Sequence, residues 1–279
     1  MLQAIGAIFM INELLKGLSK LTSTTQEVTP DILLLRFTIV NACIVGNSAE
    51  WVLIDTGLDN SDDFILSTID QRFGKSSRPK AIILTHGHFD HIGSVLKLAE
   101  QWDVPVYAHE LELTYITGKE DYPQGDATVD EGLVAKMSTF FPHKSIDLGY
   151  RAVALPKDGS IPGMPDWKWI HTPGHTKGHI SIFRESDKTL IVGDAFTTTK
   201  QESFISVLTQ HEQIKGPPAY LTTNWAAAKK SVDNIKALNP SLAIPSHGFP
   251  LSGDELDHHL EILIHDFDEI ALPENGRFV

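Results

Sequence analysis

The feature that most constrains this chain is the hexapeptide HGHFDH at residues 86–91, which holds three histidines and one aspartate in six positions. Packing alone does not explain it, because each buried ring nitrogen needs a hydrogen-bond or metal partner. Metal ligation satisfies all of these groups at once. The preceding run KAIILT (80–85) is typical of a short buried strand, so the histidines should emerge past a strand's carboxyl end, where α/β proteins build their sites.

Three later segments repeat this arrangement of an apolar run followed by a potential ligand. His175 comes after the run 167–170, Asp194 after 189–192, and His247 after 242–244. With the hexapeptide they supply five histidines and two aspartates, enough for two metal ions with positions left for water and substrate. A structural zinc would need only four ligands, usually with cysteine among them.

The pattern of apolar runs predicts the fold class. Strands are predicted at residues 32–37, 38–45, 51–55, 81–85, 104–108, 151–155, 167–170, 180–183, 189–192 and 242–244. Helices are predicted at residues 61–73, 91–102, 130–141, 223–238 and 254–270. Strands and helices do not alternate strictly, which indicates an α/β protein with two sheets packed face to face and helices outside.

One main domain is expected over residues 25–279, because no linker divides the chain. Residues 1–24 predict an N-terminal amphipathic helix that packs on the core or on a subunit partner, which would make a homo-oligomer, with a peripheral membrane anchor as the alternative. Residues 118–163 are rich in Gly, Pro and charge. We expect an insertion there, either a lid or substrate wall or a solvated excursion without a role.

Composition restricts the partners and the compartment. The chain has 36 acidic and 23 basic residues, a formal net charge of −13, which disfavours nucleic acid as a partner. No stretch approaches the roughly 20 continuous apolar residues that cross a bilayer, so no transmembrane segment is expected. The single cysteine, Cys43, excludes an internal disulfide and is expected to be a buried thiol, which makes the cytoplasm the default location.

The full order of motifs, HGHFDH followed by TPGHT, VGDAF and PSHG, resembles the metallo-β-lactamase superfamily. The similarity runs from IDTG at residues 54–57 to SHG at residues 246–248. It implies a four-layer αββα sandwich, in which two mixed sheets carry helices on their outer faces. It also implies a dinuclear metal site in a cleft at one edge of the two sheets.

The resemblance implies seven metal ligands, in two sets joined by a bridge. The first set is His86, His88 and His175, the second set is Asp90, His91 and His247, and the bridge is Asp194 together with a water or hydroxide. Two ions about 3.5 to 4 Å apart can share one oxygen nucleophile whose pKa falls toward neutrality. Asp90 would also orient the proton of that nucleophile, which makes it the candidate catalytic residue. Two divalent ions are expected, zinc before iron, manganese or cobalt.

Departures from particular subfamilies narrow the function. The best-known β-lactamases have a cysteine between the equivalents of His175 and His247, and this chain has none there. The β-lactamases that use histidines instead lack the bridging aspartate that Asp194 supplies here. We therefore expect that the chain is not a true β-lactamase. Acyl-homoserine lactonases are similar in ligand set, but Thr197 stands where they have a helper tyrosine.

Four further side chains are expected to lie behind the ligands and hold them in place. They are Asp55 at the end of a predicted strand, His171 and His179 on either side of His175, and Thr197. For the two histidines, stabilisation of the turn is part of the same expectation, and solvated surface is the alternative.

The sequence thus predicts a metal-dependent hydrolase that attacks the carbonyl of a small-molecule ester, thioester or lactone with a metal-bridging hydroxide. The alternative is a phosphodiesterase or nuclease that uses the same metals, against which the acidic balance counts. A binding protein with structural metals is disfavoured, because seven ligands overfill one closed tetrahedral site. Phe196 and Phe204 predict either an apolar acyl pocket or ordinary core packing.

Overall fold

Two mixed sheets form the centre of the protein, in a computed structural model that describes residues 23–130, 132–199 and 212–279. The first sheet has the strand order β1 to β7: β1 (Thr24–Thr29), β2 (Ile32–Arg36), β3 (Asn41–Gly46), β4 (Trp51–Ile54), β5 (Ile82–Ile83), β6 (Val106–Ala108) and β7 (Ala152–Ala154). Its first four strands are antiparallel, and β4 to β7 are parallel.

The second sheet has six strands in the order β15-β14-β11-β10-β9-β8. They are β8 (Ser160–Ile161), β9 (Met164–His171), β10 (Ile180–Arg184), β11 (Thr189–Gly193), β14 (Leu242–Pro245) and β15 (Leu251–Ser252). In this sheet β11 and β14 are the parallel pair. A separate two-stranded ladder joins β12 (Thr197–Thr199) to β13 (Glu212–Lys215).

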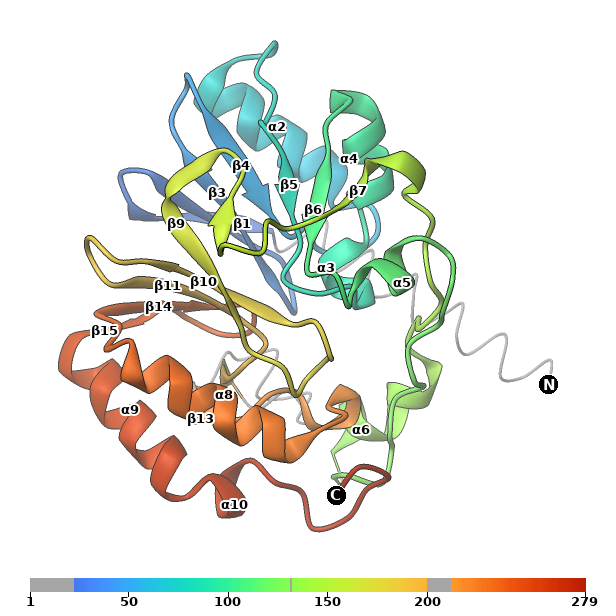
Figure 1. Cartoon of the computed structure of the whole chain (residues 1–279), viewed down its shortest axis with the longest axis vertical. Helices are drawn as coiled ribbons and strands as arrows, with labels where there is room; N and C mark the ends of the chain where they lie inside the picture. Colours follow the sequence, from blue (N-terminus) through green and yellow to red (C-terminus); the bar gives the residue numbers. More distant parts are fainter. Residues whose placement is uncertain (1–22, 131, 200–211) are drawn as a thin grey trace.

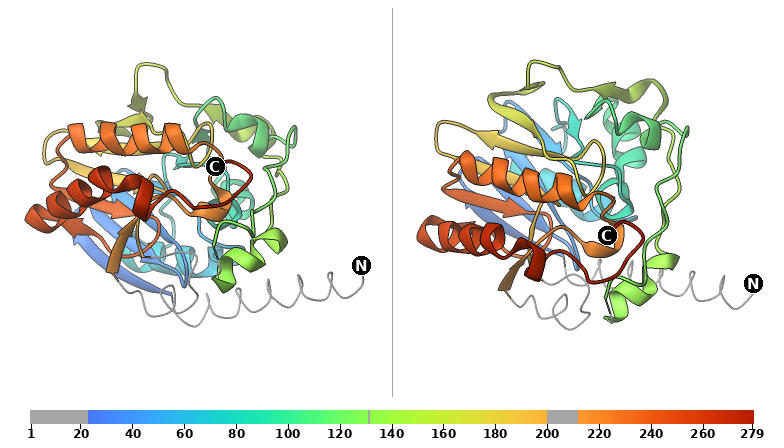
Figure 2. Two further views of the ribbon diagram at one scale, coloured as in Figure 1. Left: turned by 90° about the horizontal axis from the view of Figure 1, so that it is seen from below. Right: turned by 60° about the horizontal axis from the view of Figure 1, so that its bottom comes forward.

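Helices cover the outer face of each sheet, which gives four layers (Figure 1). Helices α2 (Asp62–Phe73), α3 (Phe89–Ile92) and α4 (Val95–Trp102) lie on the first sheet. Helices α8 (Trp225–Ala237) and α9 (Gly253–His265) lie side by side on the second, as both views in Figure 2 show. The shorter helices are α5 (Leu113–Ile116), α6 (Leu133–Met137) and α10 (Phe267–Ile270), with 3₁₀ turns at Ser138–Phe140, Gly149–Arg151 and Ala219–Leu221.

The predicted apolar runs are continuous because the sheets are buried on both faces. In β2, Ile32 and Leu34 pack between the two sheets, whereas Leu33 and Leu35 pack under the helices of the first sheet. The same alternation occurs in the second sheet, where Ile191 faces the other sheet and its neighbours face α8 and α9. Each of these strands thus packs against the other sheet with one face and against helices with the other. This is the arrangement of a four-layer sandwich, and the predicted fold is confirmed.

Two predicted helices are broken in the structure. Residues 91–102 form α3 and α4, separated at Gly93 and Ser94, because the Ser94 hydroxyl turns to Leu58 and accepts hydrogen bonds from the backbone N–H groups of Ser61 and Asp62. Ser94 therefore serves as the polar partner at the start of α2, where Ser61 makes no side-chain cap. Residues 254–270 form α9 and α10, with the break at Asp266.

Other boundaries differ by smaller amounts. Helix α8 is capped by the side chain of Asn224, 3.0 Å from the N–H of Ala227, instead of by Thr223. The predicted helix at 130–141 shrinks to α6 and a 3₁₀ turn. Strands β1, β8, β12, β13 and β15 were not predicted, because they are short or polar and lie at sheet edges or outside the main sheets.

The structure describes only part of the two segments that the sequence sets apart, residues 1–24 and residues 118–163. Residues 1–22, with the predicted N-terminal helix, lie outside the described residues, and Thr24 already belongs to β1. Residues 118–163 are irregular only in part, since β7 and β8 lie within them and belong to the two sheets. None of the described helices is long and apolar enough to cross a bilayer.

Candidate metal centre

The predicted ligands come together at one edge of the two sheets. Residues 86–91 follow β5, and His175 lies in the loop between β9 and β10. Asp194 and His247 follow the parallel strands β11 and β14, whose carboxyl ends meet at the same edge. All seven residues are buried, and each is 6% exposed or less. Side chains up to 161 positions apart in the sequence, from His86 to His247, thus lie together.

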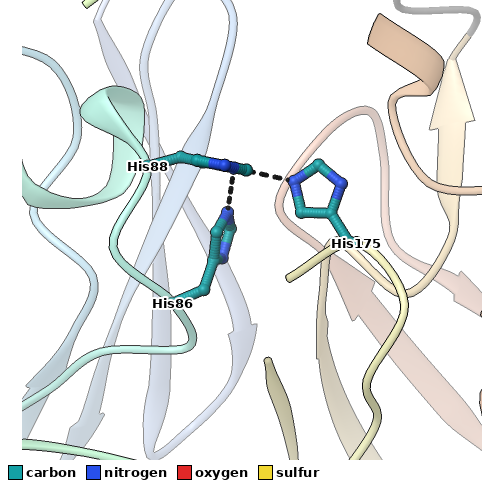
Figure 3. A group of neighbouring side chains, drawn as sticks. All are labelled: His86, His88 and His175. Atoms are coloured by element: carbon teal, nitrogen blue, oxygen red, sulfur yellow. Dashed lines mark hydrogen bonds between the residues drawn. The ribbon is translucent and has the colours of Figure 1, made fainter. Parts of the chain in front are cut away.

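The first set is a triangle of ring nitrogens (Figure 3). The Nδ1 atom of His88 lies 3.0 Å from Nε2 of His86 and 2.9 Å from Nε2 of His175. The three nitrogens come from two loops and point at one another. Three imidazole nitrogens at this spacing are donors suited to one zinc-like cation.

The second set combines carboxylates with imidazoles. Nε2 of His247 lies 3.6 Å from Oδ2 of Asp90, and Nε2 of His91 lies 3.9 Å from Oδ1 of Asp90. Asp194 lies between the sets: its carboxylate is 3.3 Å from Nε2 of His175, 3.4 Å from Nε2 of His91 and 3.1 Å from Nε2 of His247. Asp194 therefore has the position that the resemblance implies for a bridge.

The outer ring nitrogens are held by fixed acceptors. His247 donates from Nδ1 to the carbonyl of Ile39 at 2.6 Å. His175 places Nδ1 3.1 Å from the Thr222 hydroxyl, which gives its own proton to the carbonyl of Pro218 and so accepts from the ring. These bonds assign the proton to Nδ1 in both rings, so Nε2 carries the lone pair that faces the centre.

The histidines of the two sets have pKa values that are shifted in opposite directions. Burial, together with the neighbouring imidazoles, lowers the pKa of His88 to about 3 and holds the pKa values of His86 and His175 well below the usual range. The pKa of His91 lies well above the usual range, because Asp194, Asp55 and Asp90 outweigh the opposing effect of burial. The first set is therefore neutral at pH 7, as ligation by imidazole requires.

Two atoms at the centre support a fit to metal. Nε2 of His91 and Oδ1 of Asp194 are fully buried and lie 3.4 Å from each other, and neither forms a hydrogen bond with any described residue. Buried polar atoms without partners are rare, and each calls for an explanation such as a bound ion. The donor set of imidazole and carboxylate is the one that divalent ions such as zinc and iron accept.

Comparison of the sequence with models of known protein families shows which family the chain belongs to. The model of the metallo-β-lactamase superfamily matches residues 35–247, which contain the whole of the centre.

The chain belongs to the metallo-β-lactamase superfamily. It is similar to the probable metallo-hydrolase YflN of Bacillus subtilis, with 48% identity over 203 residues, 73% of this chain and 77% of that protein. The probable metallo-hydrolase YybB of the same organism is 31% identical over 198 residues, 68% of this chain and 77% of that protein. The chain is a metallo-hydrolase family member and not a true β-lactamase.

Solved structures of the superfamily share the fold. A metallo-β-lactamase family protein of Thermus thermophilus superposes with a TM-score of 0.60 at 21% identity, covering 86% of this chain and 80% of that one. A superfamily protein of Sulfolobus tokodaii gives a TM-score of 0.57 at 20% identity, covering 81% of each chain.

Two of the four side chains expected behind the ligands contact them. Asp55 Oδ2 lies 2.8 Å from Nδ1 of His91. His179 accepts a hydrogen bond at Nε2 from the backbone N–H of Asp194, at 2.7 Å, and so holds the strand end that carries Asp194. Gly193 precedes it with a φ of 64°, and a Cβ there would lie 2.5 Å from the His179 ring, so this superfamily member needs glycine at that position.

His171 closes the turn around His175, which is the turn-stabilising part of the expectation, and does not touch the ring of a candidate ligand. It donates from Nε2 to the carbonyl of Lys177 and stacks on His109. Thr197 is placed differently from the prediction. The Thr197 hydroxyl bonds the carbonyls of Thr199 and Gly216. Its neighbour Thr198 contacts the His247 backbone instead: the Thr198 N–H lies 3.0 Å and its hydroxyl 3.4 Å from the His247 carbonyl oxygen.

Some contacts at the centre have no signal in the sequence. Ile39 acts through its backbone carbonyl, which any residue type would supply, and Thr222 lies in a loop 47 positions from its partner His175. Phe196, one of the two phenylalanines considered for an acyl pocket, is fully buried in the core under α8 and α9. The other, Phe204, lies outside the described residues.

Proposed function

We propose that this superfamily member is a dinuclear metal-dependent hydrolase that cleaves a small-molecule ester, thioester or lactone. The observation that carries the proposal is the convergence of His86, His88 and His175 beside Asp194, with the second set directly adjoining. When bound, two divalent ions would lower the pKa of a water molecule and polarise the substrate carbonyl. We propose zinc as the metal. One similar solved structure, that of TTHA1623 at 24% identity, is in a di-iron-bound form, which keeps iron as the alternative.

The protein residues would supply ligation, proton handling and a binding cavity. We propose that Asp90 is catalytic, because its carboxylate lies at the centre, with Oδ2 3.6 Å from Nε2 of His247. A carboxylate at this position could accept the proton of the attacking water. No side-chain nucleophile is needed for this reaction.

A cavity beside the first set is suited to a small organic substrate. Its volume is about 400 Å³, in the range of small-molecule sites. The residues that line it include His175, Tyr122, Phe278 and Lys177. Residues 120–123 of the predicted insertion form one side, which supports a role for that part of the insertion as a substrate wall.

The cavity and the charge favour a carbonyl compound over a nucleic acid. The chain carries a net charge of −13, and a polyanionic substrate needs clustered cations. A phosphodiesterase of small substrates is the competing function, because the same ligand chemistry serves phosphoryl transfer.

The test is a substrate panel with the zinc-loaded protein: aryl esters, aryl thioesters, lactones and bis-aryl phosphodiesters. The esters, thioesters and lactones should be hydrolysed faster than the phosphodiesters. The Asp90→Asn variant should show a kcat roughly 100-fold lower or more, with an unchanged circular dichroism spectrum. His88→Ala should lose zinc as well as turnover. His258→Ala, at an exposed position on α9, is the matched control. Faster phosphodiester cleavage, or full activity of Asp90→Asn, would overturn the proposal.

A further inference from the structure

Glu112 is a buried carboxylate just before α5 that the proposed reaction does not use. Its side chain is 0% exposed and makes no ion pair with a described residue. Four donors surround it: the Thr176 hydroxyl at 2.8 Å and the Gly178 N–H at 2.9 Å reach Oε1, while the Gly87 N–H at 3.0 Å and the Tyr122 hydroxyl reach Oε2.

Three of these donors, Gly87, Thr176 and Gly178, belong to the two loops that carry the first set. Gly87 lies between His86 and His88, and Thr176 follows His175 directly. One oxygen of Glu112 thus bonds one loop and the other oxygen bonds the second loop. Because the carboxylate is rigid and planar, it fixes the distance between the loops.

Tyr122 extends the same link. Its hydroxyl donates to Glu112 and accepts from the Gly87 N–H at 2.9 Å, and its ring centroid lies 4.5 Å from that of His88. A side chain at position 87 would meet the hydroxyl, since a Cβ there would lie 2.8 Å from it. The HGH segment therefore packs directly against the Glu112–Tyr122 pair.

The chemistry of the site favours a positioning role over simple packing. An unpaired carboxylate in the interior is costly, and an apolar residue would fill the same space at less cost. The second set is held by other groups: Asp55 contacts His91, and the carbonyl of Ile39 contacts His247. The contacts of Glu112 are confined to the loops of the first set.

We propose that Glu112, assisted by Tyr122, is the positioning residue of the three-histidine metal site, and that it sets metal affinity at that site without acting on the second. This inference rests on the proposed dinuclear centre. In the Glu112→Gln variant, an NH₂ group would face one of the two pairs of donors, so one loop loses its acceptor.

The experiment measures zinc affinity by chelator competition in two parent variants of the full chain. His247→Ala leaves the first set complete, and His175→Ala leaves the second set complete. Adding Glu112→Gln should weaken zinc binding about 10- to 100-fold in the first parent and change it by less than about threefold in the second. The cobalt(II) absorption spectrum of the first parent should shift as well, because ligand geometry changes.

Glu110→Gln is the matched control, since Glu110 lies two positions away on the surface, where it pairs with Lys157 at 3.1 Å. It should leave both affinities unchanged. Tyr122→Phe keeps the ring on His88 and removes one donor, so it should show the same selectivity with a smaller loss, and it replaces Glu112→Gln if that variant does not fold. Equal losses in both parents, or none, overturn the role of Glu112. Absence of zinc binding in the unmodified chain would instead overturn the dinuclear centre, and the positioning role with it.

Discussion

Oδ2 of Asp55 lies 2.8 Å from Nδ1 of His91, on the side of the ring that faces away from the metal centre. The same carboxylate accepts hydrogen bonds from the N–H of Thr85 at 2.8 Å and from its hydroxyl at 2.7 Å. Asp55 thereby joins the end of β4 to the end of β5 and fixes the ring of His91. The consequence is that Nε2 of His91 points at Asp194 and Asp90.

We expect Asp55→Asn to weaken zinc binding at the second set about 10- to 100-fold, because the asparagine NH₂ must oppose either Thr85 or His91. The backbone should tolerate the change, since Asp55 has a φ of 57° and Asn accepts this conformation as readily as Asp. Chelator competition in the His175→Ala variant measures the effect. Asp59→Asn, at an exposed position on the following loop, should leave the affinity unchanged, and equal affinity in both variants would refute the expectation.

Gly93→Ala should destabilise the protein by about 1–3 kcal/mol or prevent folding. The φ of Gly93 is an ordinary −56°, so the problem is space: a Cβ would lie 2.2 Å from the N of Asp59 and from the C of Leu58. These are backbone atoms, which do not rotate away. Urea unfolding measures the loss, and a variant as stable as the parent protein would show that the two loops separate freely.

The convergence of the candidate ligands could be predicted because each group of them lies in the loop after a strand: residues 86–91 after β5, His175 after β9, Asp194 after β11 and His247 after β14. Strand ends are local features, and the parallel pairing of β11 and β14 then brings Asp194 and His247 together. The supports behind the ligands were predicted less well. Ile39 acts on His247 through a carbonyl from 208 positions away, and Glu112 reaches Thr176 across 64. The residues next to Ile39 and Glu112 in the sequence do not indicate either contact.

The same limit explains the broken helix at 91–102. Its apolar spacing continues from α3 into α4, and nothing local shows that Ser94 turns to the start of α2. The hydroxyl satisfies donors from a helix about 30 positions earlier, so a tertiary contact overrides a regular local pattern.

The thiol of Cys43 should be inert toward thiol reagents in the folded protein. Its side chain is 3% exposed between the two sheets, and burial, with Asp55 adding to it, raises the pKa of the thiol far above its usual value. Reaction requires the thiolate and access to solvent. Labelling with an aromatic disulfide reagent should therefore proceed at the rate of unfolding and accelerate in urea, whereas rapid labelling in buffer would contradict this packing.

His109 should make the protein less stable as the pH falls below neutrality. Its ring stacks on His171, with centroids 4.3 Å apart, and burial together with His171 lowers the pKa of His109 to about 4. The unfolded chain, in which the pKa is about 6.5, then binds the proton first, so the stability that His109 contributes is complete above about pH 6.5 and is lost as the pH falls toward 4.

The His109→Phe variant keeps the stacking and cannot titrate. Between pH 7 and pH 5, its free energy of unfolding should fall less than that of the parent protein, by about 1 kcal/mol after allowance for partial exposure. Urea unfolding of both proteins at both pH values measures the difference. Loss of metal at low pH affects the variant and the parent protein alike and so does not change the comparison. If both show the same pH dependence, His109 carries its proton in the folded state and the expectation is wrong.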